Sequence, residues 1–500
     1  MAFISGALLV GCLVIFLVWN AIQWFTKWRK MPPGPYGLPL VGYLPFIYMS
    51  PPPMHDHLFR KLHNKYGPIV SVGISQFRDI VLVGDAELAQ ELAKKEELVC
   101  RGESLIFDIM SSGGAGHLMR YGKLWHDNRK FAIRFFQDFA FRDRNRLNDL
   151  IMLDVLEVAE ILNDNLDKPF DVGVTFNMAA MRNLWRMVSK RSSDFSLTDV
   201  FIINKLFEGI GRTEDLILVM SPKGFLNYLK YIFPESWKNS FLVKEALEWG
   251  DQFVRQDISD HRRDGVDDDY IGRYLAEIDR QKGTGGTEEP TLTEEELVTN
   301  VRSLFVVGAE TSSTAISWAV KHLMENPDIQ RRAQEEVDKV IGRERPPHID
   351  DQKQMPYLTA FIEENNRISS PIPSFPRHAL QDVHCRGYLI PKGTTCLINV
   401  LAYHRNEKIF PEPEVFNPER FLDAEGNFVK PPKHLLTFGC GKRICFGENM
   451  ARTQLFLYIA TFLQRFTFSL PSEPLAKKKP TWWQYVNYPP SLRIRIQKRT

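Results

Sequence analysis

The sequence predicts a mainly α-helical fold with a minor β part, preceded by a single N-terminal transmembrane helix. Three observations support this prediction. The first 26 residues carry no charge, the stretch from residue 84 to about residue 370 has mostly helical patterns, and residues 69–83 and 371–432 are typical of short strands and turns. With 500 residues, 44% of them hydrophobic, the chain is long enough to bury a large core.

The composition excludes several classes of protein. The 63 Lys and Arg residues nearly cancel the 61 Asp and Glu residues, so there is no basic excess that would favour nucleic acid as a partner. Six cysteines are too few for a disulfide scaffold in a chain of this length, and no two of them form a CxxC zinc pair. The main body is therefore expected in a reducing compartment.

Residues 1–26 are predicted to be a membrane anchor. A helix from Phe3 to Phe25 would rise about 35 Å, enough to cross a bilayer with some tilt. Three basic residues, Lys27, Arg29 and Lys30, follow directly. Positive charge beside a span tends to stay cytoplasmic, which places the body in the cytosol. A cleaved signal peptide is the alternative, but it requires a positively charged start, which this sequence lacks.

A basic and proline-rich hinge is predicted over residues 27–37, because the run Pro32-Pro33-Gly34-Pro35 cannot continue a helix. One large domain is expected over residues 38–500. Within it, Ile69–Val83 suggests a hairpin with breaks at Gly73 and Arg78-Asp79, and Asp279–Pro290 suggests a polar, glycine-rich loop.

Two long helices are predicted in the second half of the domain. Thr293 and Glu296 form a possible capping box that would open a helix over about 294–326, whose apolar middle is typical of a helix buried through a domain centre. A final helix is expected to begin just after Cys445 and to run through Phe466.

The most informative stretch is the glycine-rich segment 438–447 around Cys445. Its three glycines allow a backbone loop to approach a flat ligand closely. Cys445 stands just before a predicted helix, whose N-terminal N–H groups favour a thiolate over a thiol, and a thiolate is the form that binds iron. A buried structural cysteine in a glycine loop is the alternative for a cysteine considered alone.

The whole segment resembles the signature loop of the cytochrome P450 family, F-x-x-G-x-R-x-C-x-G. The matching residues are Phe438, Gly441, Arg443, Cys445 and Gly447. The resemblance implies the cytochrome P450 fold, a bound haem b (iron protoporphyrin IX), and Cys445 as its proximal iron ligand. Phe438 and Arg443 are implied to be cofactor-binding residues. Cys440, in the same loop, is interpreted as a packing residue.

Other segments match the family in its order along the chain. Trp125 and Arg129 resemble the W-x-x-x-R helix that binds a haem propionate, and their i, i+4 spacing places both on one helix face. Arg377 matches a strand position that supplies another propionate contact, and Arg443 is implied to do the same from the cysteine loop.

A structural network is implied by two further motifs. Glu364 and Arg367 resemble the family's E-x-x-R pair, and at i, i+3 the two side chains share one helix face. Arg420 lies in a segment that resembles the family's P-E-R-F motif. The resemblance implies that these three side chains form a buried network behind the haem, with a structural and not a catalytic role.

The apolar helix also contains an acid and a hydroxyl, Glu310 and Thr311, which are costly to bury unless they are paired or hydrated. A hydrogen bond from Thr311 to its own helix is one explanation. The other is an oxygen pocket, in which Gly308 permits a local widening of the helix and a water chain from Glu310 past Thr311 delivers protons.

This segment resembles the family's A/G-G-x-D/E-T-T/S motif, with matches at Gly308, Glu310, Thr311 and Ser312. The resemblance implies that Glu310 and Thr311 are catalytic. Val307 departs from the family's Ala or Gly, and its larger side chain is expected to crowd the oxygen pocket or to turn the substrate.

The resemblance implies an NADPH-dependent haem-thiolate monooxygenase that inserts one oxygen atom from O₂ into a lipophilic small molecule, such as a steroid, a terpenoid or fatty-acid-like compound, or a xenobiotic. The sequence has no GxGxxG motif, so electrons are expected from a partner, NADPH–cytochrome P450 reductase, with cytochrome b5 as a second candidate. The microsomal animal type of the family implies the endoplasmic reticulum membrane. Docking candidates are Lys130, Lys433 and Lys442, for each of which an ordinary solvated lysine is an equal interpretation.

Family position implies a mainly apolar substrate pocket bordered by 104–117, 207–212, Phe305, Ile372 and 485–486. Residues 221–237, with aromatic and basic side chains, could lie in the membrane surface, or equally form a packed helical hairpin. Two alternative functions are a haem-thiolate isomerase or dehydratase without a reductase, and a non-enzymatic haem or lipid binder. Glu310 and Thr311 argue against the isomerase, which needs no proton relay.

Overall fold

A computed structural model of the chain divides into two compact units, each assembled from separate stretches of sequence. The first contains Met1–Gly102, Ser374–Tyr403 and Gly441–Arg443, and the second contains Glu103–Pro373, His404–Cys440 and Ile444–Thr500. The prediction of a single domain over residues 38–500 stays a prediction. The structure describes residues 11–499 apart from positions 13, 16–17, 20–21, 24, 36, 39–41, 52–54, 76–77, 103–115, 120, 143, 191–233, 266–267, 284–288, 431–434, 472–484 and 490–492.

The first unit is built on a four-stranded sheet with the order β1-β2-β7-β4. Strands β1 (Ile69–Ser75) and β2 (Arg78–Val83) form the antiparallel hairpin that the sequence predicts, with a register shift after Gly73. Strand β7 (Thr395–Asn399) runs parallel to β2 and antiparallel to β4 (Ser374–His378). Val70 and Val81 are fully buried in this sheet, as expected for β-branched residues on a packed face.

Short elements complete the first unit. Strands β5 (Val383–Cys385) and β6 (Tyr388–Ile390) form a separate hairpin. Asp85 caps helix α4 by accepting a hydrogen bond of 2.8 Å from the backbone N–H of Leu88. Within its described residues, and besides the N-terminal helical positions, this unit has α2 (Leu44–Tyr48), π-helix η1 (His55–Phe59), α3 (Arg60–Tyr66), α4 (Ala86–Ala93) and the 3₁₀ turns η2 (Glu96–Leu98) and η5 (Gly441–Arg443). Helix α18 (Val400–His404) carries the chain from the first unit into the second.

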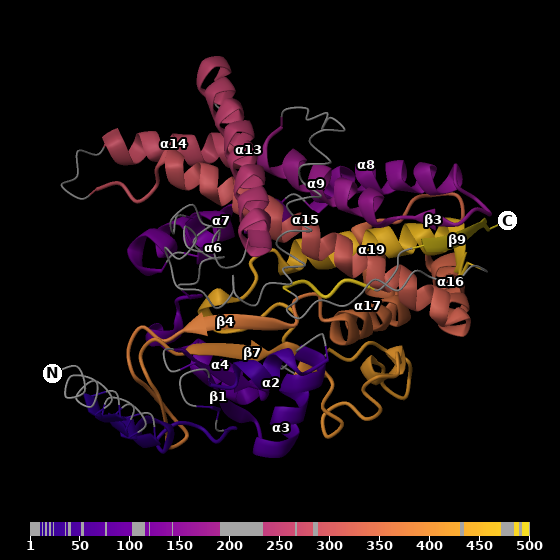
Figure 1. Ribbon diagram of the computed structural model, residues 1–500. Helices are drawn as coiled ribbons and strands as arrows, with labels where there is room; N and C mark the ends of the chain where they lie inside the picture. Colours follow the sequence, from indigo (N-terminus) through magenta and orange to yellow (C-terminus); the bar gives the residue numbers. More distant parts are fainter. Residues whose placement is uncertain are drawn as a thin grey trace. The chain divides into compact units, whose positions relative to one another are not determined.

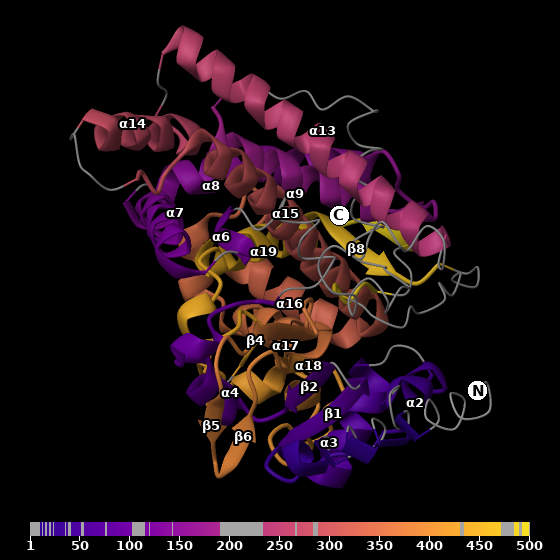
Figure 2. The same ribbon diagram turned by 60° about the vertical axis from the view of Figure 1, so that its left-hand side comes forward.

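The second unit is mainly helical, and α15 packs along α9 and contacts α19 (Figures 1 and 2). Its α-helices are α6 (Gly116–Met119), α7 (Gly122–Arg142), α8 (Arg144–Asn163), α9 (Gly173–Val188), α13 (Pro234–Asp264), α14 (Tyr270–Gly283), α15 (Glu294–Glu325), α16 (Pro327–Val340), α17 (Pro356–Ser369) and α19 (Glu448–Arg465). Two 3₁₀ helices, η3 (Ile349–Gln354) and η4 (Pro418–Phe421), and a small sheet of β3 (Phe170–Asp171), β9 (Arg493–Lys498) and β8 (Phe466–Ser469) complete it.

Aromatic side chains fill the core of the second unit. Phe176 of α9 stacks on Phe462 of α19 with ring centroids 5.7 Å apart, and both rings are fully buried. Phe361 of α17 and Phe456 of α19 belong to the same apolar cluster. Each such ring contributes about 2–3 kcal/mol through burial, so the facing sides of α9, α17 and α19 hold this unit together.

The two long helices lie close to their predicted bounds, and α19 ends at Arg465, one residue before the predicted end at Phe466. Helix α15 covers Glu294–Glu325, and the hydroxyl of Thr293 accepts a hydrogen bond of 3.2 Å from the backbone N–H of Glu296. The carboxylate of Glu296 accepts a bond of 2.8 Å from the backbone N–H of Gly116, a partner far away in sequence. The loop predicted at Asp279–Pro290 is wrong at its start, because α14 continues through Gly283 with Tyr274, Leu275 and Ile278 buried on one face.

The N-terminal segment contacts the sheet of the first unit. Lys27 forms an ion pair with Asp79, and the carbonyl of Pro33 accepts a hydrogen bond of 2.9 Å from the backbone N–H of Ser71. A Cβ atom on Gly34 would lie only 1.8 Å from the carbonyl oxygen of Ser71, so this approach requires glycine.

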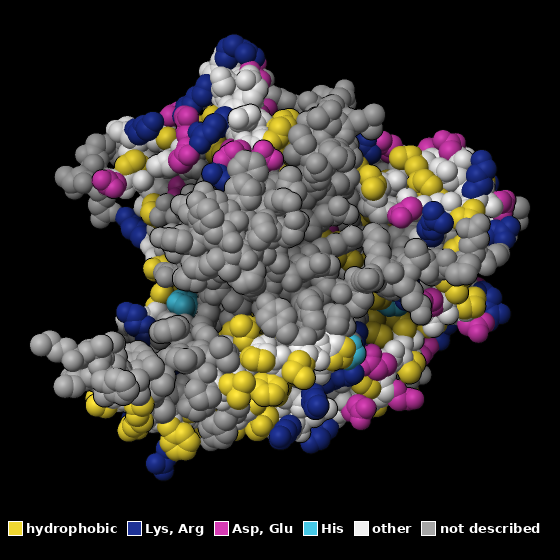
Figure 3. Space-filling view, in the orientation of Figure 1, with side chains coloured by type: hydrophobic (Ala, Val, Ile, Leu, Met, Phe, Trp, Pro, Cys, Tyr) yellow, Lys and Arg dark blue, Asp and Glu magenta, His cyan; other side chains and the backbone are white. Residues whose placement is uncertain are grey.

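The predicted anchor, residues 1–26, lies partly outside the described residues. Its described positions from 11 onward are helical. They expose apolar side chains, among them Val14, Ile15, Val18 and Trp19. Figure 3 shows hydrophobic and charged side chains together on the face of the molecule that it draws. Among the described residues, no helix combines the length and the apolar character needed to cross a membrane.

Candidate functional site

The segment 438–447 forms a closed backbone loop. The backbone N–H of Cys445 donates a hydrogen bond of 2.9 Å to the carbonyl of Phe438, and Gly439 N–H donates one of 2.8 Å to Leu436. Gly439 has a φ of 77°, a value that favours glycine over other residues. Within the first unit, a Cβ on Gly441 would lie 2.4 Å from the carbonyl oxygen of Ala93. Gly439 and Gly441 are therefore required by backbone geometry.

Cys445 has the surroundings of a metal-binding thiolate. It is exposed and belongs to no disulfide, whereas Cys440 is buried, in keeping with a packing role. Gly447 caps α19, which begins at Glu448, so Cys445 lies just before a helix N-terminus with its partial positive charge. These features favour the ionised thiol and leave it accessible to a ligand.

Arg129 supplies a cation beside this thiol. It is buried on α7, and its Nη2 atom donates a hydrogen bond to the carbonyl of Ile444. Its guanidinium lies 5.5 Å from the ring centroid of Phe446 and 6.0 Å from that of Trp125. Burial lowers the pKa of Arg129, and attraction to the Cys445 thiolate opposes this shift. The structure thus brings Trp125 and Arg129 together, and Arg129 next to the cysteine loop.

Two further predicted arginines belong to the first unit. Arg377, on β4, is buried, and its Nη1 atom donates a hydrogen bond of 2.8 Å to the carbonyl of Pro376. Arg443 is also buried, with its Nε atom 2.9 Å from the carbonyl oxygen of Val99. A guanidinium carries five N–H donors, so each of these side chains can bind the backbone and an anionic group together.

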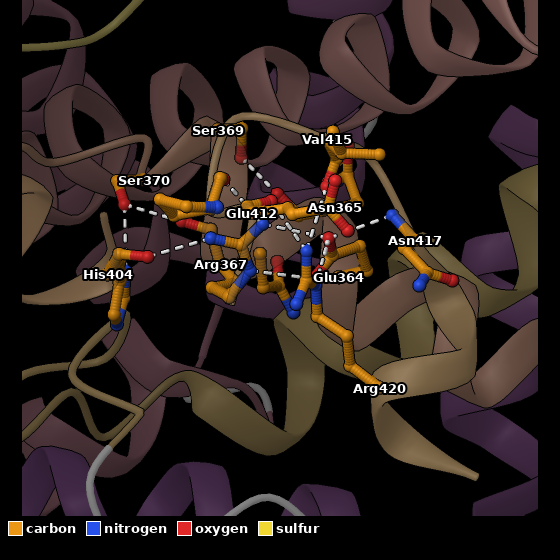
Figure 4. A network of polar contacts seen from close by, with 12 residues as sticks. Glu364, Asn365, Arg367, Ser369, Ser370, His404, Glu412, Val415, Asn417 and Arg420 are labelled. Carbon is orange, nitrogen blue, oxygen red and sulfur yellow. Dashed lines mark hydrogen bonds and ion pairs between the residues drawn. The ribbon is translucent and has the colours of Figure 1, made fainter. Parts of the chain in front are cut away.

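Glu364, Arg367 and Arg420 meet in one buried network (Figure 4). Arg367 binds Glu364 in a two-pronged pair, with N–O distances of 2.7 and 2.8 Å, and both side chains are fully buried. The Nε atom of Arg420 lies 3.3 Å from Glu364, and the backbone N–H of Asn417 donates a bond of 2.9 Å to the same carboxylate. Every oxygen of this buried carboxylate therefore has a partner, which limits the cost of its burial.

The network also reaches the segment that leads into the cysteine loop. Arg367 donates a hydrogen bond of 2.7 Å to the carbonyl of His404 and one of 2.9 Å to that of Pro413. The hydroxyl of Thr437 donates one of 3.1 Å to the carbonyl of Asn366. Nothing in the sequence around His404 indicated this role.

The acid and the hydroxyl of α15 point to different partners. Thr311 donates a hydrogen bond of 2.7 Å to the carbonyl of Val307 in its own helix. Glu310 is buried, and its Oε2 atom accepts a hydrogen bond of 2.8 Å from Nδ2 of Asn177 on α9. Sequence reasoning missed Asn177, because it lies 133 positions from Glu310 and belongs to no motif.

The widening of the helix at Gly308 is not present. Helix α15 is an uninterrupted α-helix from Glu294 to Glu325. A Cβ at Gly308 would lie 3.0 Å from Cδ2 of Leu184, so the glycine serves the close approach of α9. The predicted widening was wrong, since the helix is regular at Gly308. The absence of a side chain there is explained by the packing of Leu184 against the helix.

The structure describes only some of the remaining predicted residues. Phe305 lies against Trp185 with ring centroids 5.1 Å apart, and Ile372 and Tyr485 are half-buried. Val486 is buried. Lys442 forms an ion pair with Glu96 in the first unit, and Lys130 is exposed. Outside the described residues lie Lys433, 104–115, 207–212 and most of 221–237.

Comparison with known proteins decides what this arrangement represents. The family model for cytochrome P450 matches residues 32–496, nearly the whole chain. The chain belongs to the cytochrome P450 family. Members of this family bind haem b and are oxidoreductases of the monooxygenase class, and this chain is therefore a haem-dependent, NADPH-dependent monooxygenase.

Curated relatives cover most of this cytochrome P450. Cytochrome P450 2E1 of Sus scrofa is 30% identical over 479 residues, 94% of this chain and 93% of the relative. Cytochrome P450 2J3 of Rattus norvegicus is 30% identical over 89% of this chain and 88% of its own length. Cytochrome P450 18a1 of Drosophila melanogaster is 29% identical over 97% of this chain and 90% of its own length.

The residues of this cytochrome P450 fit a haem-thiolate site. An exposed thiol at a helix N-terminus is a suitable iron ligand. In the second unit Arg129, and in the first unit Arg377 and Arg443, are buried cations of the kind that binds a carboxylate, and a backbone carbonyl holds each of them in place. The Cys445 thiol therefore suits the iron of haem b, and each of the three buried arginines, taken by itself, suits a propionate carboxylate.

Proposed function

We propose that this monooxygenase inserts one oxygen atom from O₂ into a lipophilic small molecule, and that the thiolate of Cys445 would hold the haem iron. The observation that carries the proposal is the exposed Cys445 thiol at the start of α19, next to the buried Arg129. Haem b, when bound, supplies the activation of O₂ and the transfer of oxygen.

The other residues of the site position and balance the cofactor. Arg129, Arg377 and Arg443 would neutralise the propionates. Trp125 would bind a propionate beside Arg129, whose guanidinium lies over its ring. Phe438 would hold the cysteine loop closed, because its carbonyl accepts a hydrogen bond from the backbone N–H of Cys445. Glu364, Arg367 and Arg420 stabilise the polypeptide that carries this loop.

Glu310 and Thr311 would deliver protons during the reaction. A hydroxyl that donates to its own helix can still accept a hydrogen bond, so Thr311 can order a water molecule while bonded to Val307. Glu310 is the acid from which a proton would be supplied. These two side chains favour a monooxygenase over a haem-thiolate isomerase or dehydratase, since an isomerase consumes no protons.

A lipophilic substrate is supported by the apolar residues predicted to border the pocket. Phe305, Ile372 and Val486 are the described members of that set, and each is wholly or partly buried. Apolar linings with few polar groups are typical of sites for such ligands.

The proposed electron donor is NADPH–cytochrome P450 reductase, with cytochrome b5 as a further partner, at the endoplasmic reticulum membrane. Residues 1–26 would form the single membrane anchor, with the catalytic domain in the cytosol. The exposed apolar side chains of its described part and the basic residues Lys27, Arg29 and Lys30 support this orientation.

The deciding experiment is the carbon monoxide difference spectrum of the reduced, purified protein. We expect the strongly red-shifted Soret band of a thiolate ligand in the wild type and in Cys440→Ala, and its loss in Cys445→Ser. An ordinary Soret band in the native wild type, or an unchanged band in Cys445→Ser, would overturn the ligand assignment. Product that requires NADPH, reductase and O₂ excludes the isomerase, whereas conversion of a hydroperoxide without reductase or external electrons would favour it.

A further inference from the structure

A buried hydrogen bond joins α15 to α9. Nδ2 of Asn177 donates a hydrogen bond of 2.8 Å to Oε2 of Glu310. Glu310 is 5% exposed and Asn177 is 9% exposed, so water competes little for this bond. A hydrogen bond from an amide to a buried carboxyl group restricts the orientation of that group more than a bond at the surface would.

The close packing of the two helices makes this short contact possible. Gly308, two positions before Glu310, has no side chain, and Leu184 of α9 occupies the space where one would begin. Asn and Glu side chains together are short, and they can meet only where the two backbones approach closely. The close approach of α9 at Gly308 therefore agrees with the direct contact between Asn177 and Glu310.

The second polar atom of Asn177 is informative as well. Its Oδ1 atom is buried and has no hydrogen-bond partner among the described residues. A buried carbonyl oxygen without a partner is costly, and an ordered water molecule is the usual partner where the site is polar. A water molecule bound to Oδ1 would be linked to the carboxyl group of Glu310 through the side-chain amide of Asn177.

We infer that Asn177 is a positioning residue for proton delivery: it holds the carboxyl group of Glu310 toward α9 and, through Oδ1, binds the water from which that group is protonated again after each turnover. The inference rests on the proposed monooxygenase function. According to this inference, protons reach Glu310 from the side of α15 that faces α9. The sequence motif alone relates Glu310 only to Thr311.

The consequence for the reaction follows from its stoichiometry. Productive turnover converts RH, O₂, NADPH and one proton into ROH, water and NADP⁺. When protons arrive too slowly, the same O₂, NADPH and proton leave as hydrogen peroxide and NADP⁺, with RH unchanged. Loss of Asn177 should therefore shift NADPH consumption from product to hydrogen peroxide.

The test compares Asn177→Ala with Asn183→Ala in reconstituted, haem-loaded protein with reductase. Asn183 lies on the same helix, is buried to a similar degree, and bonds to Leu150 and Asp154 instead of Glu310. We expect product per NADPH to fall about tenfold in Asn177→Ala, the size expected for one hydrogen bond to a charged group, and to change little in Asn183→Ala. The carbon monoxide spectrum should stay that of the wild type in both variants.

A double-mutant cycle separates positioning from mere packing. If Asn177 acts through Glu310, then Asn177→Ala should add no further loss in a Glu310→Gln background. Additive losses, or equal losses in Asn183→Ala, would overturn the inference. An Asn177→Ala protein that does not fold would be replaced in the cycle by Asn177→Leu, which fills the space without a polar group.

Turnover driven by hydrogen peroxide distinguishes failure of this inference from failure of the proposed function. Hydrogen peroxide and RH give ROH and water with no external electrons or protons, so Asn177→Ala should match the wild type in that assay. A deficit of Asn177→Ala there would overturn the positioning role. A wild type that forms no product with NADPH, reductase and O₂ would instead overturn the proposed function.

Discussion

The Nε2 atom of His404 accepts a hydrogen bond of 3.0 Å from the backbone N–H of Leu436, two residues before Phe438. Nε2 must therefore be unprotonated, so Nδ1 carries the hydrogen and donates it to Oγ of Ser370, 2.8 Å away. The carbonyl of the same residue binds Arg367. His404 thus joins the buried glutamate–arginine network to the start of the cysteine loop.

Replacement of His404 should loosen this connection. His404→Phe keeps the volume of the ring but leaves the N–H of Leu436 and the Ser370 hydroxyl without their partner. We expect the free energy of unfolding to fall by about 2–4 kcal/mol and the thiolate-type carbon monoxide band to decrease. Urea unfolding and the spectrum check this, with His126→Phe as control, because the His126 side chain is 65% exposed. Equal behaviour of the two variants would contradict the role of His404.

Acid should destabilise the folded chain through its buried histidines. Burial lowers the pKa of both His322 and His404 to about 3, so each stays neutral when folded. The unfolded chain binds these protons below a pH of about 6.5. The contribution of the two neutral histidines to the free energy of unfolding is therefore fully present above a pH of about 6.5. It is lost as the pH falls toward about 3, by up to about 1.4 kcal/mol per pH unit for each histidine.

The titration of His322 can be removed while its stacking is kept. His322 lies over the ring of Phe416, with centroids 4.2 Å apart, and bonds to Asn365. In His322→Phe, urea unfolding between pH 6.5 and 4.5 should show a shallower loss of stability than in the wild type. The same slope in both proteins would show that His322 does not take up a proton on unfolding.

Loss of Arg129 should weaken haem binding. Arg129→Leu removes the cation near Cys445 and the bond to Ile444. We expect about tenfold weaker haem affinity in a titration of the apoprotein, since outer groups of a metal site typically contribute that much. Arg134→Leu, an exposed position on the same helix, is the control. Similar affinities in both variants would show that Arg129 does not contact the haem or its ligand.

Arg367 should tolerate no replacement, even by lysine. Its bonds to Glu364, His404 and Pro413 need the planar guanidinium, which a single ammonium cannot reproduce. Arg367→Lys is expected to lower the free energy of unfolding by about 3 kcal/mol or more. Arg420→Lys should have a smaller effect, because that side chain is 12% exposed and bonds more weakly to Glu364. Calorimetry of the two variants gives the order.

Thr311→Ala should divert electrons to hydrogen peroxide. We expect product per NADPH to fall about tenfold or more if the hydroxyl orders a water during proton delivery. The matched control is Thr314→Ala, a buried threonine of the same helix whose hydroxyl has no partner among the described residues. An unchanged ratio of product to NADPH in Thr311→Ala would show that the hydroxyl serves only its hydrogen bond to Val307 and has no role in proton delivery.

Much of the fold and part of the site could be predicted because they depend on local patterns. The extent of α15 follows from its cap at Thr293 and its long apolar run, and the hairpin of β1 and β2 follows from β-branched residues around a break. The pairing of Glu364 with Arg367 is also local, since residues three apart share a helix face. The cysteine loop could be recognised because its glycines and Cys445 are close in sequence.

Other features depend on which helices pack together, and no local pattern contains that information. The sequence alone determined the family, the α-rich class and the candidate thiolate. Only the tertiary structure decided that Glu310 faces Asn177, that the carboxylate of Glu296 accepts a hydrogen bond from the backbone N–H of Gly116, and that Gly308 accommodates Leu184 without widening its helix. The physical reason is that a side chain's rotamer and partner depend on the shape of the neighbouring helix, and that shape is set by residues more than one hundred positions away.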